Sequence, residues 1–269
     1  MSNTIFITGA SSGLGKKTAL LFAKKGWDVI ATMRNPGAEQ ELSQVTNIRL
    51  LTLDVTNLQQ IEDTIAALLK TTKIDVVFNN AGYGLAGPFE AATDEQLQQQ
   101  INTNLVGVLR VTKAFIPHFR KRGKGMFITT TSIGGHVAFP FNSVYHATKW
   151  ALEGWTESLA YELAPFGITI KSVAPGGIST DFVSRSLVMT NHEAYKTFTD
   201  KVLSIFMDTK RQKDYSTPEQ IAEVVYQAAT DGTSQLRYIA GKDARKLYKV
   251  RRLFGYKFFM KQINKMFFK

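Results

Sequence analysis

The chain has 269 residues, of which 44% are hydrophobic, and its formal net charge is +11 at pH 7. It contains no cysteine, which excludes disulfides, thiolate metal sites and cysteine nucleophiles. No run of about 18 apolar residues occurs and the first residues lack the pattern of a signal peptide, so we expect neither a membrane-spanning helix nor a leader. We therefore expect a folded cytoplasmic protein.

The positive charge is concentrated at the C-terminal end of the sequence. Residues 242–269 hold ten Lys or Arg and one acid, Asp243, whereas the rest of the chain is close to neutral. A basic tail of this kind is compatible with contact to nucleic acid, with contact to a membrane surface, or with solubility alone.

Short apolar runs rich in β-branched residues alternate with amphipathic stretches along the chain. The pattern predicts strands at residues 5–7, 27–32, 48–53, 76–78, 126–129, 168–173 and 236–239. It predicts helices at residues 14–25, 58–70, 94–118 and 144–163, and a further helix that starts at Thr217-Pro218-Glu219. Such alternation is typical of a single α/β domain whose parallel sheet is covered by helices on both faces.

A glycine-rich turn follows the first predicted strand and precedes the first predicted helix. It reads Thr8-Gly9-Ala10-Ser11-Ser12-Gly13-Leu14-Gly15. Glycines at such a junction let the backbone approach a pyrophosphate, which binds at the helix N-terminus. The spacing differs from the standard dinucleotide fingerprint, but its position in the α/β pattern favours a dinucleotide site.

The end of the second predicted strand indicates which dinucleotide binds. Enzymes that prefer NAD usually carry an acid there, to bind the ribose hydroxyls. This chain has Ala31-Thr32-Met33-Arg34-Asn35, with no acid. Because Arg34 offers a permanently charged fork suited to a phosphate group, we predict NADP(H) as the cofactor.

A serine, a tyrosine and a lysine form a candidate catalytic group. Tyr145 and Lys149 are four residues apart in a predicted helix, on one face and within contact. A nearby ammonium lowers the pKa of a phenol, which suits general acid–base catalysis. Ser132 follows the fifth predicted strand of the sheet, at the carboxyl edge where ligands of such sheets bind, and can polarise a carbonyl oxygen.

In combination these motifs resemble those of the short-chain dehydrogenase/reductase family, in its compact branch, over about residues 3–240. The segments that match are the glycine turn with Gly9, Gly13 and Gly15, Asp54 in Leu53-Asp54-Val55-Thr56, Asn79-Asn80-Ala81-Gly82, Asn104-Leu105-Val106-Gly107, the Ser132/Tyr145/Lys149 group, and Pro175-Gly176-Gly177-Ile178-Ser179-Thr180. Thr148 stands where the family often has serine. The resemblance is strongest to NADP-preferring hydroxysteroid and retinol dehydrogenases.

The resemblance implies a Rossmann-type doubly wound sheet and an NADP(H)-dependent oxidoreductase that interconverts a carbonyl and an alcohol on an apolar substrate. The implied catalytic residues are Asn104, Ser132, Tyr145 and Lys149, with Tyr145 as general acid or base and Asn104 holding a water in a relay toward Lys149. The implied cofactor-binding residues are Gly9, Ser11, Ser12, Gly13, Leu14, Gly15, Arg34, Asp54, Val55, Asn80, Ala81, Gly82, Tyr145, Lys149, Pro175, Gly176, Ile178 and Thr180.

Two other functions fit these motifs less well. Epimerases of the extended branch have a different glycine spacing in the turn from that of this chain. A non-enzymatic dinucleotide-binding regulator typically lacks the tyrosine or the lysine that this chain keeps. The four histidines do not cluster at metal spacing, so we predict no metal site, and the basic tail carries no nucleic-acid recognition motif.

Two expectations concern contacts beyond the substrate. The predicted catalytic helix carries Trp150 and Trp155, and members resembling this chain associate through that helix, so we expect a homo-oligomer. In the tail, apolar residues recur at helical spacing on both sides of Gly255, with cations between them. We expect residues 1–241 to form the catalytic domain and residues 242–269 to form two short helices packed on it. The alternative that stays open is peripheral contact of the tail with an anionic membrane surface.

Overall fold

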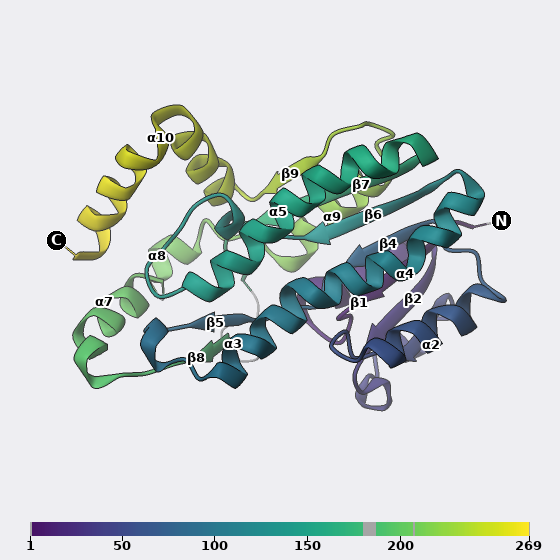
Figure 1. Ribbon diagram of the computed structural model, residues 1–269, viewed down its shortest axis with the longest axis horizontal. Coiled ribbons are helices and arrows are strands. Elements are labelled where there is room, and N and C mark those ends of the chain that lie inside the picture. Colours follow the sequence, from purple (N-terminus) through teal and green to yellow (C-terminus); the bar gives the residue numbers. More distant parts are fainter. Residues whose placement is uncertain (1, 180–186, 207, 269) are drawn as a thin grey trace.

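The computed structural model describes residues 2–179, 187–206 and 208–268. Its centre is a sheet of seven parallel strands in the order β3-β2-β1-β4-β6-β7-β9 (Figure 1). These strands are β1 (Thr4–Thr8), β2 (Asp28–Met33), β3 (Ile48–Thr52), β4 (Val76–Asn79), β6 (Gly125–Thr130), β7 (Ile168–Pro175) and β9 (Arg237–Ala240). The parallel α/β fold predicted from the sequence is thus confirmed.

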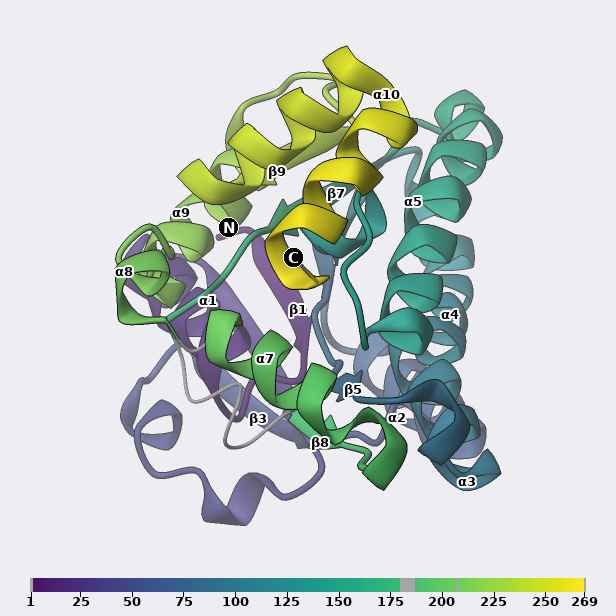
Figure 2. The same cartoon turned by 90° about the vertical axis from the view of Figure 1, so that its left-hand side faces the viewer.

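Helices cover both faces of the sheet. On one face lie α1 (Gly13–Lys24) and α9 (Pro218–Thr230), and on the other lie α2 (Leu58–Leu69), α4 (Gly107–Arg122) and α5 (Ser143–Leu163) (Figure 2). The side chains of β1 alternate between two cores: Ile5 and Ile7 pack toward α1 and α9, whereas Phe6 packs toward α2, α4 and α5. This alternation explains why the strands read as continuous apolar runs.

The predicted start of α9 is confirmed in detail. Thr217 is the N-cap residue, and its hydroxyl accepts a hydrogen bond from the backbone N–H of Gln220. In return, the backbone N–H of Thr217 donates to Oε1 of Gln220. Pro218 occupies the first helical position, where no N–H is needed.

The helix predicted at residues 94–118 is interrupted. The structure has α3 (Asp94–Ile101), a π-helical turn (Asn102–Val106) and then α4. The turn is fixed by two contacts: Asn104 bonds to the backbone of Tyr83, and a Cβ on Gly107 would lie 2.9 Å from the carbonyl oxygen of Val55. A π-helical turn inside an α-helix commonly marks a functional site.

Several small elements were not predicted. They are a pair of parallel three-residue strands, β5 (Gly84–Ala86) and β8 (Leu187–Met189), and the helices α7 (Lys196–Phe206) and α8 (Thr209–Gln212). The two strands are too short to show a periodicity, and their partners are distant in sequence, so no local pattern reveals them.

The tail forms α10 (Lys242–Phe268), which Gly255 divides into two arms by adopting a non-helical conformation at φ 73° and ψ 177°. The first arm places Ala244 against Ile133 and Val137, and the second arm buries Phe259 and Phe267. The second arm lies beside α7, where its Phe267 meets Phe206 (Figure 2). Among the described residues, no helix combines the length and apolarity needed to cross a bilayer.

Candidate active site

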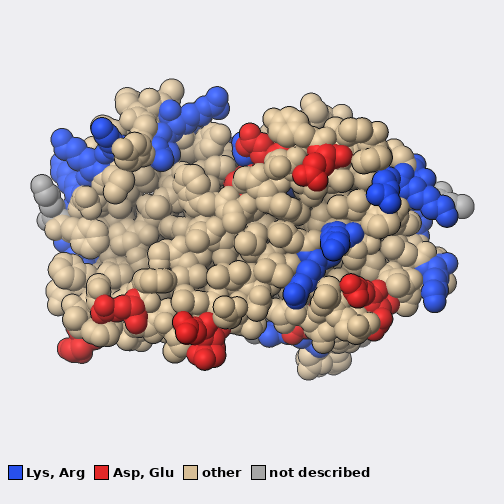
Figure 3. Space-filling view, in the orientation of Figure 1, with Lys and Arg blue, Asp and Glu red and all other residues tan. Residues whose placement is uncertain are grey.

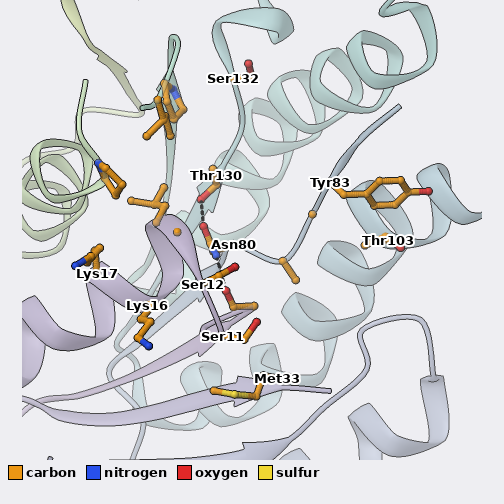
Figure 4. Close-up of a pocket in the computed structure, with 18 of the residues that line it drawn as sticks. Ser11, Ser12, Lys16, Lys17, Met33, Asn80, Tyr83, Thr103, Thr130 and Ser132 are labelled. Atoms are coloured by element: carbon orange, nitrogen blue, oxygen red, sulfur yellow. Dashed lines mark hydrogen bonds between the residues drawn. The ribbon is translucent and has the colours of Figure 1, made fainter. Parts of the chain in front are cut away.

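A cavity of about 1390 Å³ opens at the carboxyl ends of the sheet strands (Figure 4). The glycine turn and Met33 lie toward one end of it and Ser132 toward the other. The predicted site residues that line it are Gly9, Ser11, Ser12, Gly13, Leu14, Arg34, Asp54, Val55, Asn80, Ala81, Gly82, Ser132, Tyr145, Lys149, Pro175, Gly176 and Ile178. Gly15 and Asn104 support the cavity from behind, and Thr180 lies outside the described residues.

The glycine turn forms an open cradle at the N-terminus of α1. Gly9 and Gly13 have φ angles of +68° and +52°, which only glycine adopts easily. A Cβ on Gly9 would lie 2.7 Å from the Cα of Ala81, and one on Gly15 would lie 2.2 Å from the carbonyl oxygen of Gly9. The cradle therefore requires glycines, and its shape fits the pyrophosphate of a dinucleotide.

Three strand ends are joined beside the cradle by side chains. The hydroxyl of Thr8 accepts hydrogen bonds from the backbone N–H groups of Asn80 and Ala81, at 2.9 and 3.1 Å. The Asn80 amide donates to the carbonyl oxygen of Gly9 at 3.1 Å and accepts from the hydroxyl of Thr130 at 3.2 Å. Asn80 thus ties β1, β4 and β6 together and holds the edge of the sheet on which a ligand would rest.

Ser132, Tyr145 and Lys149 meet at the other end of the cavity. Ser132 follows β6 as the cap of a short helical turn, and its hydroxyl accepts a bond from Gly134 at 3.0 Å and pairs with the phenol of Tyr145. The ammonium of Lys149 lies 5.7 Å from the centre of the Tyr145 ring and donates to the carbonyl oxygen of Thr130 at 2.9 Å. The spacing of four along α5 therefore brings both side chains to one face, as the sequence indicates.

The expected lowering of the Tyr145 pKa is not what the structure gives. Burial raises the pKa of Tyr145, and the hydrogen bond from Ser132 offsets this effect only in part. The expectation was wrong because it counted the nearby charge and not the loss of water around the phenol. The phenol is consequently held in its neutral, proton-donating form at neutral pH.

The pKa of Lys149 is also shifted, toward the neutral range. Burial lowers the pKa of Lys149 to about 8, and the charge of Glu153 opposes this shift. Glu153 stands one further turn along α5 and is buried. Its carboxylate accepts bonds from Ser172 and Arg237 and lies 3.3 Å from the imidazole of His136. The sequence reading missed Glu153, although the same spacing of four that links Tyr145 to Lys149 also reaches it.

Asn104 is buried in the π-helical turn, and its amide is fully engaged. It accepts a bond from the backbone N–H of Tyr83, donates to the carbonyl oxygen of Tyr83 at 2.8 Å, and donates to the hydroxyl of Thr148 at 3.5 Å. The side chain holds the segment after β4 against α5. The water relay implied by the family resemblance stays a prediction.

Arg34 lies at the rim of the cavity, one residue beyond β2. Its side chain is exposed and forms no ion pair or hydrogen bond with any residue that the structure describes. Lys16 and Glu41 line the same end of the cavity and pair with one another at 3.0 Å. The sequence reading named Arg34 but not these two, because their significance depends on the fold around them.

The Pro175–Gly177 segment is held by the start of the tail. The backbone N–H of Gly177 donates to the carboxylate of Asp243 at 2.7 Å, and a Cβ on Gly176 would lie 2.2 Å from the same carboxylate. A Cβ on Gly177 would in turn meet the ring of Tyr215 at 2.3 Å. Asp243, the single acid of the tail, therefore positions one wall of the cavity.

The cavity is also lined by residues that no sequence motif marks. They are Tyr83, Gln96, Gln99, Thr103, Val188 and Tyr215. Tyr83 precedes β5, Gln96 and Gln99 lie on α3, and Thr103 lies in the π-helical turn. Val188 lies on β8 and Tyr215 lies in the segment before α9. His136, which stands close to Ser132 in sequence, does not line the cavity and instead packs edge-on against Tyr248 of α10, with ring centres 5.1 Å apart.

Comparison with known proteins identifies the class to which this fold and site belong. The family model described as short chain dehydrogenase matches residues 3–191. The chain therefore belongs to the short-chain dehydrogenase family, and it is an NAD(P)-dependent oxidoreductase that interconverts a carbonyl and an alcohol.

Three curated relatives illustrate the range of similar proteins. The chain is 36% identical to the uncharacterized oxidoreductase YusZ of Bacillus subtilis, over 92% of both chains. It is 40% identical to a 3-ketodihydrosphingosine reductase of Bacteroides thetaiotaomicron, over 66% of this chain and 65% of that protein. It is 32% identical to human 17-beta-hydroxysteroid dehydrogenase type 1, over 87% of this chain and 76% of that protein.

Solved structures of similar proteins share the fold. A short-chain dehydrogenase from Streptomyces avermitilis is 31% identical, with a TM-score of 0.85 over 94% of this chain and 93% of that one. ElxO with NADP bound is 28% identical, with a TM-score of 0.74 over 89% and 96%. A 3-ketoacyl-(acyl-carrier-protein) reductase from Brucella melitensis complexed with NADH is 25% identical, with a TM-score of 0.75 over 89% and 96%. Both coenzymes thus occur among these neighbours.

Proposed function

We propose that the protein interconverts apolar ketones and alcohols with NADP(H) as coenzyme and with Tyr145 as the general acid or base. One observation carries the proposal: Ser132, Tyr145 and Lys149 line the cavity whose other end is the glycine cradle. A substrate carbonyl bound beside Ser132 would therefore lie between proton donors and the dinucleotide.

The side chains have distinct tasks in this proposal. The coenzyme, when bound, supplies or accepts the hydride at the substrate carbon. In the direction of reduction, Ser132 donates a hydrogen bond to the carbonyl oxygen and polarises it. Tyr145 transfers its phenolic proton to that oxygen, so the carbonyl becomes an alcohol. The resulting phenolate is stabilised by the ammonium of Lys149 until a proton from solvent replaces the one transferred.

The preference for NADP(H) rests on the adenosine end of the cavity. Arg34 is exposed there without a partner among the described residues, whereas Lys16, which also lines the cavity, is paired with Glu39 and Glu41. One charge-assisted contact with a phosphate contributes about 1.5–3 kcal/mol, which is about a tenfold to hundredfold difference in affinity. We expect the wild-type protein to prefer NADPH over NADH by such a factor.

The coenzyme preference is tested by a matched pair of substitutions. Arg34→Ala should remove most of the preference, measured as the ratio of kcat/KM for NADPH and NADH. Arg49→Ala is the control, because Arg49 is an exposed arginine of the neighbouring strand β3 that does not line the cavity. Equal use of both coenzymes by the wild type would contradict the proposal.

An apolar substrate is supported by the apolar side chains among those that line the cavity, which include Ile178 and Val188. Similar proteins named for a ketosphingoid base, a retinol and a hydroxysteroid also act on apolar compounds. We test this by following NADPH absorbance with ketones of graded size and polarity. Higher kcat/KM for small charged carbonyl compounds than for long-chain or polycyclic ketones would contradict it.

We also propose that the protein is a homo-oligomer that associates through α5. One face of α5 is exposed and carries Ala147, Trp150, Gly154 and Tyr161, at helical spacing. Nothing described lies within 4 Å of a Cβ built on Gly154, so a second helix has room to approach. Gly154→Arg should reduce the mass measured by light scattering to that of a monomer, whereas a monomeric wild type would overturn this proposal.

A further inference from the structure

Exposed apolar side chains gather at the bend in the middle of α10. The structure exposes five of them between residues 253 and 260: Leu253 (75% exposed), Phe254 (60%), Tyr256 (55%), Phe258 (40%) and Met260 (57%). We call these five residues the apolar bend. Single exposed apolar residues are ordinary on a protein surface, but a contiguous group indicates contact with something outside the protein.

The apolar bend is held outward by the rest of α10. The inner face of each arm is already packed on the body of the protein, through Ala244 in the first arm and Phe259 and Phe267 in the second. The rings of Phe254 and Phe258 lie 4.9 Å apart and pack against one another. Since the inward-facing positions are occupied, the apolar bend has no way to bury itself without detaching an arm.

Cations surround the apolar bend. Besides Lys242 and Arg245 near its start, α10 holds seven Lys and Arg residues: Lys246, Lys249, Arg251, Arg252, Lys257, Lys261 and Lys265. Within the described part of the chain none of these seven forms an ion pair with an acid, although Arg251 lies over the ring of Tyr256 at 5.8 Å. Figure 3 shows blue side chains on both sides of a tan tip at the upper left, where Figure 1 places α10.

The combination of charge and apolarity distinguishes between three partners. A second copy of the chain would bring an equally basic tail, and like charges would repel. A nucleic acid would neutralise the cations but would leave Leu253 and Met260 in water. An anionic lipid surface accommodates both the cations and the apolar side chains. The cations attract its headgroups, while the apolar side chains enter the boundary with the acyl chains.

We propose that the apolar bend and its cations dock α10 on the surface of an anionic lipid bilayer. The protein then lies on the membrane, since no described helix can span it. This inference goes beyond the proposed function and does not depend on it, because it needs only the outer surface of α10.

The first test is co-sedimentation of the full chain with vesicles. Wild-type protein should bind phosphatidylcholine vesicles that contain about one third phosphatidylserine, and should not bind vesicles of phosphatidylcholine alone. Affinity should fall at least about tenfold between low salt and about 0.5 M salt, because the salt screens the cations. Failure to bind anionic vesicles at low salt would overturn the proposal.

Two matched pairs of variants test which side chains are responsible. The triple change Arg252→Glu, Lys257→Glu and Lys261→Glu should weaken binding more than about a hundredfold, at about fivefold for each cation removed. Its control is Lys70→Glu, Lys121→Glu and Lys124→Glu, three exposed lysines elsewhere.

The triple change Leu253→Ser, Phe254→Ser and Met260→Ser should weaken binding at least about tenfold. Its control is Leu58→Ser, Phe89→Ser and Phe166→Ser, which alter exposed residues away from the tail and from the exposed face of α5.

A fluorescent reporter measures insertion directly. In Phe254→Trp the new indole is exposed in solution, so its emission should shift to shorter wavelength with anionic vesicles and be quenched by brominated acyl chains. An unchanged spectrum would overturn the proposal. Two further results would overturn the proposal. One is an absence of vesicle binding together with binding to duplex DNA that the Leu253→Ser, Phe254→Ser, Met260→Ser variant retains. The other is self-association of the wild type that this variant abolishes.

Discussion

The helices α5 and α10 place their charges in opposite ways. In α5, Lys149 and Glu153 are buried, and each is hydrogen-bonded to groups of neighbouring strands. In α10, nine Lys and Arg residues lie along a helix whose single acid, Asp243, is engaged with Gly177 instead. A buried charge is stable only where the protein provides fixed partners, whereas an exposed and unpaired charge remains available to a partner outside.

The same chain thus uses its charges in two different ways. Burial acts on Tyr145 and Lys149 in opposite directions, since it raises the pKa of Tyr145 and lowers the pKa of Lys149 to about 8. Most of the cations of α10 are exposed and would be available to a surface that approaches. The packed inner face of α10 nevertheless connects the two regions, because it rests on Ile133 and Val137, directly after Ser132.

The largest expected effect concerns the chemistry on α5. Tyr145→Phe removes the proton donor but keeps the ring, so kcat should fall by about 10²–10⁴ while NADPH affinity stays nearly unchanged. Coenzyme binding is followed by titration and turnover by NADPH absorbance. Tyr161→Phe is the control, because it makes the same change on an exposed residue of the same helix. Retention of more than about a tenth of the activity by Tyr145→Phe would contradict its role.

The second prediction separates the inner from the outer face of α10. Phe259 is 4% exposed and its neighbour Phe258 is 40% exposed. Phe259→Ala should weaken the docking of the second arm by about 3 kcal/mol, so its backbone amides should exchange with solvent about a hundredfold faster. Phe258→Ala should leave exchange nearly unchanged. Equal protection in both variants would mean that the second arm is not held by its inner face.

The sequence predicted most of the sheet and the residues of the cavity for a clear reason. Each depends on a local signal: apolar runs for strands, glycines where the backbone must turn, and a spacing of four for Tyr145 and Lys149. The π-helical turn at residues 102–106 gave no such signal, because its cause is the backbone of Tyr83 on another segment. The same holds for Asp243, which reaches Gly177 across the fold.

The electrostatics of the site were the hardest part to predict. From spacing alone the ammonium of Lys149 was expected to govern the pKa of Tyr145, whereas burial dominates. The extent of burial depends on β6, α5 and the turn after Ser132 together, so it is a property of the packed protein and not of a motif.

The smallest effect is expected at Glu153, which we propose as a positioning residue acting through Lys149. Burial lowers the pKa of Lys149 to about 8, and the negative charge of Glu153 limits that decrease. Glu153→Gln removes the charge, so the pKa of Lys149 should fall further and a smaller fraction of Lys149 should be protonated at pH 7. The alkaline limb of the pH–rate profile for reduction should therefore move to lower pH, and the rate at pH 8 should fall about threefold to tenfold. Glu157→Gln is the matched control, because Glu157 pairs with the same Arg237 but is exposed and is not among the groups that shift Lys149. A purely structural role of Glu153 would lower the melting temperature without moving the pH profile, and that result would refute its electrostatic role.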